Sequence, residues 1–355
     1  MSRVIRVLVV DDSALVRESL AALLGAEVDL VVITASDPLI AMRKMAEAPP
    51  DVIILDLRLP RMDGITFLRK LMAEGPVPVV VCSAYADATG AEGIEALRAG
   101  AVAIIEKPTF GVREFLEEAA RGLVETVRAA AQSRPRSARR IPIKPPAAPP
   151  RAPVPRAPVP RAWPPIVAIG ASTGGTEALA TVFEGLPADA PGMVVVQHIP
   201  ARFSRALAQS LDRAGPVRVR EAASGDEVRS GVALLAPGDR HVRVRRRGGG
   251  YFVELDDSAP VSRHRPSVDV LFLSVAAEAA ANGVGVLLTG MGEDGADGLL
   301  AIKRAGGLTF AQDEESCVVF GMPRAAIERG AASRVLSVGA MATAIARTAW
   351  KESRS

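Results

Sequence analysis

Several residue types are scarce in this chain of 355 residues, and each scarcity excludes something. The two cysteines, Cys82 and Cys317, cannot build a disulfide framework, so we expect a reducing, cytoplasmic setting. No run of about eighteen uncharged apolar residues occurs, and the apolar stretch near the start is too short for a signal peptide, so we expect no membrane insertion. Three histidines leave few candidates for a general base. The length and the 49% of apolar residues are typical of two folded domains.

The basic character of the chain, with a pI near 9.1, comes from one segment. Residues 134–165 hold 12 of the 27 prolines and eight basic residues, with no acidic residue. The rest of the chain has 35 basic and 40 acidic residues, a net charge of −5. Proline excludes helix interiors and central strands, so the segment is interpreted as an extended linker. A basic arm for nucleic acid or lipid is the alternative, but aromatic residues do not alternate with its charges.

The first third of the chain alternates short apolar runs with amphipathic stretches. The pattern predicts strands at 4–10, 30–34, 52–57, 77–81 and 102–105, and helices at 14–24, 39–47, 65–73, 91–99 and 112–130. Five strand–helix units in succession indicate a five-stranded parallel sheet with helices on both faces. Functional sites of such sheets lie at the carboxyl ends of the strands.

Polar residues stand at four of the five expected strand ends. Asp11 and Asp12 follow the first strand, Asp56 ends the third, Ser83 the fourth, and Lys107 the fifth. Carboxylates that meet at one edge repel each other unless a cation joins them, and oxygen ligands suit Mg²⁺. With Lys107 opposite, such a site can accept a phosphoryl group on a carboxylate. A structural acidic cluster with one salt bridge is the plainer alternative.

These residues, with LRLPRMDGI after Asp56, resemble the response-regulator receiver family and its flavodoxin-like fold. The resemblance implies Asp56 as phospho-acceptor and a histidine kinase as phosphodonor. It implies a switch role for Ser83 and Lys107, and a Mg²⁺ site formed by Asp11, Asp12, Asp56 and the backbone carbonyl of Arg58. One departure is Ile104, which stands where the family usually has an aromatic residue. Coupling of an aromatic rotamer to phosphorylation is therefore in question.

A serine follows the first strand expected beyond the linker. Residues 166–169 are interpreted as a buried strand, GASTGG at 170–175 as a tight turn, and 176–185 as a helix with Thr176 as its N-cap. Ser172 in this turn fits the G-x-S-x-G nucleophile elbow. The same glycines could cradle a phosphate or simply form a structural turn.

A serine nucleophile needs a base, and His198 is the best placed of the three histidines. It follows the buried strand expected at 193–196, and therefore lies at the same sheet edge as Ser172 if the two strands are parallel neighbours. His241 lies in a loop-to-strand stretch. His264 lies between two arginines that would lower its basicity. For these two, a half-buried and satisfied structural histidine is the expected role.

A carboxylate that orients the base is expected in the glycine-rich turn TGMGEDG. This turn follows a strand expected at 284–288 and precedes a helix at 296–305. Glu293, Asp294 and Asp297 compete for the role. Asp294 is preferred because it lies at the turn, whereas Asp297 falls in the helix. The order Ser, His, Asp differs from that of the α/β-hydrolases, so any triad belongs to a different fold.

Residues 164–352 resemble the catalytic domain of the chemotaxis protein-glutamate methylesterases, the CheB family. The resemblance rests on GASTGG, QHIP, LLAPGDRH, RPSVDVLF, LLTGMGEDGADGL and GMPRAAI. It implies a parallel doubly wound α/β fold, with Ser172 as nucleophile, His198 as base, Asp294 as orienting acid and the N–H of Met291 as oxyanion donor. No metal or other cofactor is expected there.

The two resemblances together imply a phosphorylation-activated enzyme that demethylates glutamyl γ-methyl esters of chemoreceptors, and a glutaminase activity on receptor glutamines. Expected domains are a receiver at 1–125, a linker at 126–163 and a catalytic domain at 164–352, in a monomer that binds no nucleic acid. A phospho-regulated scaffold without catalysis is the alternative. A DNA-binding regulator is a further rival, although no helix-turn-helix pattern is found in the second half and 243–247 alternates as a strand.

Overall fold

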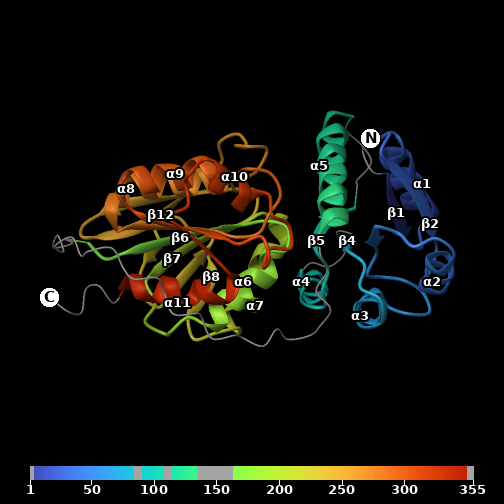
Figure 1. Cartoon of the computed structure of the whole chain (residues 1–355), viewed down its shortest axis with the longest axis horizontal. Coiled ribbons are helices and arrows are strands. Elements are labelled where there is room, and N and C mark those ends of the chain that lie inside the picture. Colours follow the sequence, from blue (N-terminus) through green and yellow to red (C-terminus); the bar gives the residue numbers. More distant parts are fainter. Residues whose placement is uncertain (1–3, 84–89, 108–112, 134–162, 350–355) are drawn as a thin grey trace. The chain divides into compact units, whose positions relative to one another are not determined.

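The computed structural model describes residues 4–83, 90–107, 113–133 and 163–349. For Ser83, residues 113–121 and Ala349 it describes the backbone only. The chain forms two compact units, of which one contains the first five strands and the other contains the rest (Figure 1). Most of the expected linker, residues 134–162, lies outside the described residues. Among the residues described, no helix is long and apolar enough to cross a membrane.

The N-terminal unit is built on a five-stranded parallel sheet in the order β2-β1-β3-β4-β5, as expected. Its inner strands are buried because they are runs of Val, Ile and Leu; all four residues of β3, for example, are buried. The strands are β1 (Ile5–Val10), β2 (Leu30–Ala35), β3 (Val52–Leu55), β4 (Val79–Ser83) and β5 (Ala103–Glu106).

Five helices alternate with these strands, and side chains fix three of the helix starts. Ser13, Asp37 and Asp63 each accept a hydrogen bond from a backbone N–H in the first turn of the following helix. The helices are α1 (Ala14–Gly25), α2 (Pro38–Glu47), α3 (Gly64–Glu74), α4 (Ala91–Arg98) and α5 (Arg113–Gln132). Helix α5 therefore extends through the first seven residues of the range expected as linker.

The C-terminal unit contains a seven-stranded parallel sheet in the order β15-β14-β13-β6-β7-β10-β8. The strands are β6 (Ile166–Ala171), β7 (Gly192–Gln197), β8 (Arg218–Glu221), β10 (Val232–Leu235), β13 (Gly283–Leu287), β14 (Leu308–Gln312) and β15 (Arg334–Leu336). After β6 the chain adds β7, β8 and β10 on one side of this strand. It then returns and adds β13, β14 and β15 on the other side. The sheet thus has a topological switch point at β6, where ligands of such sheets bind.

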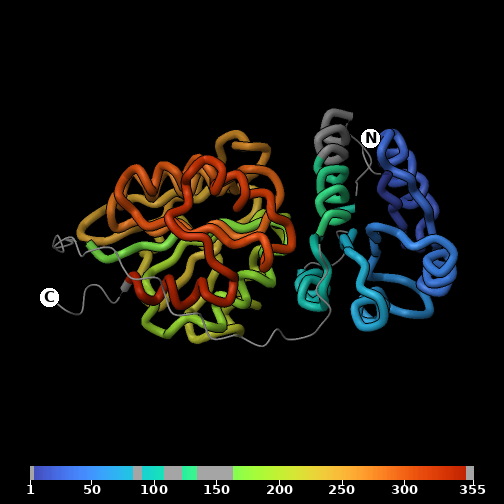
Figure 2. The backbone as a smooth tube through the Cα atoms, viewed as in Figure 1, coloured from blue at the N-terminus to red at the C-terminus, as the bar shows by residue number. Residues whose placement is uncertain are grey.

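Helices cover both faces of this sheet, so the expected doubly wound architecture is confirmed. Within this unit, α8, α9 and α10 run along one side of the sheet and α6 and α11 along the other, and the same path can be followed in Figure 2. The helices are α6 (Gly175–Glu184), α7 (Ala201–Asp212), α8 (Val268–Ala279), the short 3₁₀ helix Ala280–Asn282, α9 (Ala296–Arg304), α10 (Met322–Glu328) and α11 (Val338–Ala349). Leu271 and Phe272 of α8 and Leu299 and Ile302 of α9 are fully buried in the core beneath α8 and α9.

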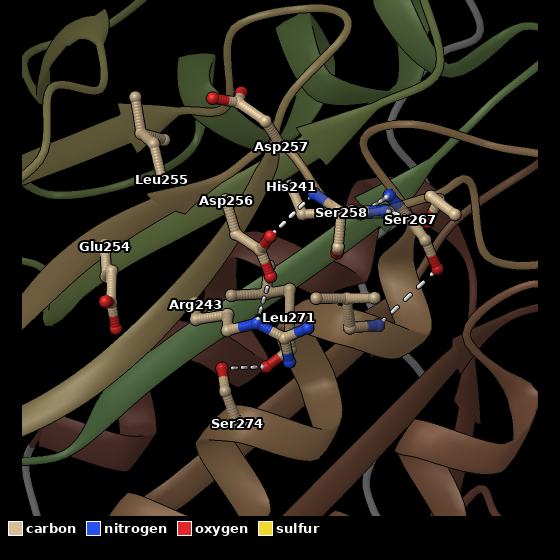
Figure 3. A network of polar contacts seen from close by, with 12 residues as sticks. His241, Arg243, Glu254, Leu255, Asp256, Asp257, Ser258, Ser267, Leu271 and Ser274 are labelled. Atoms are coloured by element: carbon tan, nitrogen blue, oxygen red, sulfur yellow. Dashed lines mark hydrogen bonds and ion pairs between the residues drawn. The ribbon is translucent and has the colours of Figure 1, made fainter.

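A separate antiparallel ribbon contains the arginines that follow His241. Strands β9 (Glu227–Val228), β11 (His241–Arg247) and β12 (Gly250–Asp256) form it in the order β11-β12-β9. Arg243 donates to Asp256 at 2.8 Å and Arg245 to Glu254 at 2.7 Å, and Figure 3 shows Asp256 between Ser258 and Arg243. These arginines face acidic partners across the ribbon, which is not the arrangement of a surface that binds phosphates.

Candidate active site

Ser172 lies at the switch point, directly after β6. Its backbone N–H donates to the carbonyl oxygen of Thr289 at 3.0 Å, and its own carbonyl oxygen accepts from Gly175 N at 2.8 Å. Gln197 Nε2 donates to the same carbonyl oxygen at 2.8 Å. The backbone on both sides of the serine is therefore fixed by bonds to the turn, to β7 and to the end of β13.

The turn after Ser172 differs in one detail from expectation. Helix α6 begins at Gly175, with Gly174 as its N-cap in the left-handed region (φ 75°), so Thr176 lies inside the first turn and the prediction of Thr176 as N-cap was wrong. A glycine is needed at 175 because a Cβ there would lie 2.2 Å from Gln197 Oε1 and 2.7 Å from Ala171 Cβ. The close packing of the turn on β7 explains Gly175, and the positive φ of Gly174 explains the other glycine of the pair.

His198 stands on the neighbouring strand, one position beyond the end of β7. Ala171 pairs with Gln197 in parallel register, and His198 N donates to Ala171 O at 3.0 Å. Ser172 and His198 therefore continue two adjacent strands, which lie about 4.8 Å apart in parallel sheets. The two side chains come from the same sheet edge, as the sequence predicts.

Asp294 contacts the base. His198 Nε2 and Asp294 Oδ2 are 2.8 Å apart, and among the described residues His198 Nδ1 has no hydrogen-bond partner although it is buried. Because Asp294 is an acceptor, Nε2 carries the proton and Nδ1 keeps a free lone pair. That lone pair is the atom that can take a proton from a serine hydroxyl.

Four donors surround the Asp294 carboxylate. Besides His198, these are Ser267 Oγ at 2.7 Å, Val268 N at 2.7 Å and Asp269 N at 3.1 Å. Burial alone would raise the pKa of Asp294, but the donors outweigh it and lower the pKa to about 2. Asp294 is therefore ionised at neutral pH although it is almost fully buried.

The two competing acids lie elsewhere. Glu293 Oε2 accepts from Arg329 Nη2 at 2.5 Å, and Asp297 Oδ1 lies 3.2 Å from Arg329 Nε, both on exposed side chains. Of the three competing acids, Asp294 is the one that contacts His198.

The loop that carries Met291 passes directly over Ser172. A Cβ at Gly290 would lie 2.7 Å from Ser172 Cβ, so only glycine allows this approach. Gly290 N donates to Val319 O, and its carbonyl oxygen accepts from Gly321 N and Met322 N. These bonds hold the start of the loop, and Met291 is the next residue along it.

The other two histidines have different surroundings. His241 is fully buried, with Nε2 3.1 Å from Ala259 O, and its Nδ1 accepts from Ser267 N at 3.1 Å. It supports Ser267 and so matches the expected structural role. His264 instead stacks on His198, with ring centroids 3.7 Å apart and an interplanar angle of 15°.

Sequence reasoning missed this contact and the Ser267 donor. Burial is the main reason that the pKa of His264 is lowered to about 3; His198 lowers it further, and the neighbouring Arg263 has a smaller effect than the sequence suggested. The block RPSVD directly after His264 was the available signal, since it spans the start of α8 and contains Ser267, the N-cap of that helix.

The N-terminal unit brings its expected acidic residues together. One carboxylate oxygen from each of Asp11, Asp12 and Asp56 lies within 4.8 Å of the others. Lys107 Nζ is 2.7 Å from Asp11 Oδ2 and 2.8 Å from Asp56 Oδ2. Burial raises the pKa of Asp56, opposed by Lys107 and assisted by Asp11. Oxygen donors with this excess of negative charge fit a hard divalent cation.

Two further expected residues stand at this edge. Ser83 ends β4, but its side chain lies outside the described residues. Ile104 is buried on β5, and a Cβ at Gly93 of α4 would lie 2.3 Å from Ile104 Cδ1. The position of the usual aromatic residue is thus taken by an aliphatic side chain packed against α4.

Fold and site together define a two-domain protein, in which a receiver-like sheet precedes an α/β domain with a hydrolase-type cluster of serine, histidine and aspartate. The response regulator receiver domain matches residues 7–120, and the CheB methylesterase family matches residues 167–345.

Similar proteins cover nearly the whole chain. A protein-glutamate methylesterase/protein-glutamine glutaminase of Anaeromyxobacter dehalogenans is 53% identical over 96% of this chain and 98% of its own length. One from Xanthomonas oryzae is 49% identical over 95% of this chain and 98% of its own. The solved CheB catalytic domain of Thermotoga maritima is 39% identical, with a TM-score of 0.51, and covers 52% of this chain and 98% of that one. The chain belongs to the CheB methylesterase family.

Proposed function

We propose that this protein is a phosphorylation-activated serine hydrolase that removes methyl groups from glutamyl γ-methyl esters of chemoreceptors and deamidates receptor glutamines. The observation that carries the proposal is the 2.8 Å contact between His198 and Asp294, at the sheet edge that Ser172 also occupies. The names of the similar proteins, protein-glutamate methylesterase/protein-glutamine glutaminase, support the choice of substrate.

In the proposed reaction, Ser172 Oγ attacks the ester carbonyl while His198 Nδ1 takes the hydroxyl proton. Asp294 holds the ring and stabilises the imidazolium. The N–H of Met291 donates to the oxyanion of the tetrahedral intermediate. The C–O bond to the methoxy group then breaks, and the proton on His198 leaves with methanol. Water hydrolyses the acyl-enzyme by the same proton path and leaves a glutamate carboxylate. A glutamine loses ammonia in place of methanol.

Regulation is proposed to come through Asp56, the phospho-acceptor of the receiver domain, with a histidine kinase as phosphodonor. Asp11, Asp12, Asp56 and the Arg58 carbonyl would hold Mg²⁺, which neutralises charge on the phosphoryl group when bound. Lys107 already contacts Asp56 and supplies a fixed positive charge at the same place. Ser83 is proposed as the hydroxyl that responds to phosphorylation.

The remaining proposals concern the setting of the enzyme. We infer a cytoplasmic monomer with domains at 1–125 and 164–352 and a Pro/Arg-rich linker within 126–163, of which α5 occupies the first seven residues. Nucleic-acid binding is not proposed, since Arg243 and Arg245 of the ribbon are engaged by acidic partners.

Methanol release from a methylated receptor fragment, with and without a small phosphodonor, tests the proposal. Ser172→Ala should abolish release, and the control Ser230→Ala, at a serine that contacts Asp189 and Ala190 outside the site, should not. Asp56→Asn should keep basal release and lose its stimulation, whereas the control Asp51→Asn should keep both. Unchanged release by Ser172→Ala would show that the catalytic assignment is wrong and would favour the scaffold alternative.

A further inference from the structure

The segment that carries His264 is a tight two-residue turn. Val261 and His264 pair across it, with Val261 N donating to His264 O at 3.1 Å and His264 N to Val261 O at 2.9 Å. The central residues, Ser262 and Arg263, both have positive φ, at 52° and 65°. Glycine or asparagine normally occupies such positions, so this turn is held in an unfavourable conformation. Backbone strain of this kind concentrates at functional sites.

Arg265 anchors the turn at its base. Its Nη2 donates to Asp239 Oδ1 at 2.7 Å, and its Nη1 donates to the carbonyl oxygens of Asp257 at 3.1 Å and Ser258 at 3.2 Å. The guanidinium thus joins the chain before the turn to the loop at Asp239. These bonds hold the turn in place against its own strain.

The residues that follow reach the other side of the same histidine. Ser267 Oγ, Val268 N and Asp269 N all donate to Asp294, which in turn contacts His198 Nε2. One short stretch, residues 264–269, therefore contacts the ring of His198 on its face and supports its hydrogen-bond partner at its edge.

A hydrogen bond to Nε2 alone does not fix the plane of the His198 ring. It places one ring atom, while the ring can still tilt about the line from Nε2 to Asp294 Oδ2. The near-parallel ring of His264, 3.7 Å away, removes that freedom on one face. The direction of Nδ1, the atom that has to meet the serine hydroxyl, depends on this second restraint.

We propose that His264 is a positioning residue, which holds the ring of His198 in the plane in which Nδ1 points to Ser172, and which exchanges no proton itself. The nitrogen lone pairs of an imidazole lie in its ring plane, so a face-to-face stack directs them away from the partner ring. No proton can pass directly between the two histidines in this arrangement. The inference rests on the proposed roles of Ser172 and His198.

Two substitutions of His264 in the full-length protein separate positioning from proton transfer. His264→Phe keeps an aromatic face and removes both nitrogens, whereas His264→Leu keeps a similar volume and removes the planar ring. For methanol release from a methylated receptor fragment, we expect kcat of His264→Phe to stay within about threefold of the native value. We expect His264→Leu to lose about tenfold to a hundredfold in kcat, with KM changed less than about twofold, since small misplacements of catalytic groups have effects of this size.

Two results would overturn the inference. An equal loss in His264→Phe and His264→Leu would mean that an imidazole nitrogen is required, and native kcat in His264→Leu would mean that the stack is dispensable. If His264→Leu fails to fold, His264→Gln takes its place with the same expectation. Ser172→Ala, assayed in parallel, distinguishes a failure of the proposed function from a failure of the positioning role. Methanol release by Ser172→Ala would contradict the proposed function itself. No release by Ser172→Ala, together with full activity of His264→Leu, would contradict the positioning role alone.

Discussion

The substitution Asp294→Asn tests the central contact of the site because each of the four groups hydrogen-bonded to this carboxylate is a donor. His198 Nε2 and Val268 N reach Oδ2, and Ser267 Oγ and Asp269 N reach Oδ1. An asparagine has to place its NH₂ group at one of these positions. Wherever it goes, the NH₂ meets at least one backbone N–H, so one buried donor loses its acceptor.

The two orientations of the asparagine have different consequences. With NH₂ toward His198, Nε2 becomes the acceptor and the imidazole proton moves to Nδ1, which can then no longer accept the proton of Ser172. An error of this kind in serine-protease triads lowers kcat about 10⁴-fold, and we expect a loss of that order. With NH₂ toward Asp269, the tautomer is kept but the negative charge that stabilises the imidazolium is lost. Since hydrogen bonds to a buried charge contribute about 1.5–3 kcal/mol each, the domain should lose about 3 kcal/mol of stability.

The stability loss has a pH signature. The folded-state pKa of Asp294, about 2, lies below the ordinary value of 3.8. Its stabilisation is therefore complete above about pH 4 and disappears as the pH falls toward 2. Urea unfolding at pH 7 and at pH 3 should show a gap between native protein and Asp294→Asn that narrows in acid.

The matched control is Asp297→Asn, three residues away on α9, where the carboxylate is exposed and faces Arg329. It should change stability by less than about 1 kcal/mol and leave methanol release near native. If Asp294→Asn keeps kcat within tenfold of native and unfolds at the same urea concentration, the reasoning about this carboxylate is refuted.

Three other changes give distinct expectations. Lys107→Ala leaves Asp11 and Asp56 buried side by side, so the receiver should lose about 2–3 kcal/mol in urea without Mg²⁺ and recover part of it when Mg²⁺ is added; no Mg²⁺ effect would contradict the metal site. Asp56→Asn removes a buried carboxylate whose pKa is raised by burial, so the urea midpoint of the receiver at pH 7 should equal or exceed that of the native protein. The midpoint of the native protein should approach that of the variant as the pH falls. A lower midpoint for the variant at pH 7 would refute this. Ser267→Ala removes one donor to Asp294, so it should lower the free energy of unfolding by about 1 kcal/mol, measured by calorimetry, and lower kcat for methanol release severalfold. Unchanged values would show that the hydroxyl contributes to neither.

The sheets and the strand-end residues were predictable because they depend on local patterns. A run such as VIIL at 52–55 is buried whichever helix covers it, and parallel neighbours bring Ser172 and His198 to one edge without further information. The choice of Asp294 among three acids followed from its place in the turn.

The supports of the site were not predictable, because they depend on contacts between distant segments. The stack of His264 on His198 requires a turn with two residues at positive φ, which no local propensity predicts for Ser262 and Arg263. The bond from Ser267 to Asp294 joins residues 27 positions apart. Thr176 carries the right side chain for an N-cap, yet the N-cap is Gly174, whose positive φ and close approach to Val318 admit only glycine.

Because β6 lies between β7 and β13, the active site has one part that the sheet holds and another that the loops hold. Ser172 and His198 directly follow β6 and β7, Asp294 lies in the turn between β13 and α9, and these three strands are tied to one another through the ladder. The sheet therefore holds the backbone at Ser172 and His198, whereas Asp294 depends on its bonds to Ser267, Val268 and Asp269. Exchanging loop residues that contact neither Asp294 nor its donors should change the preference for a substrate segment without altering the chemistry.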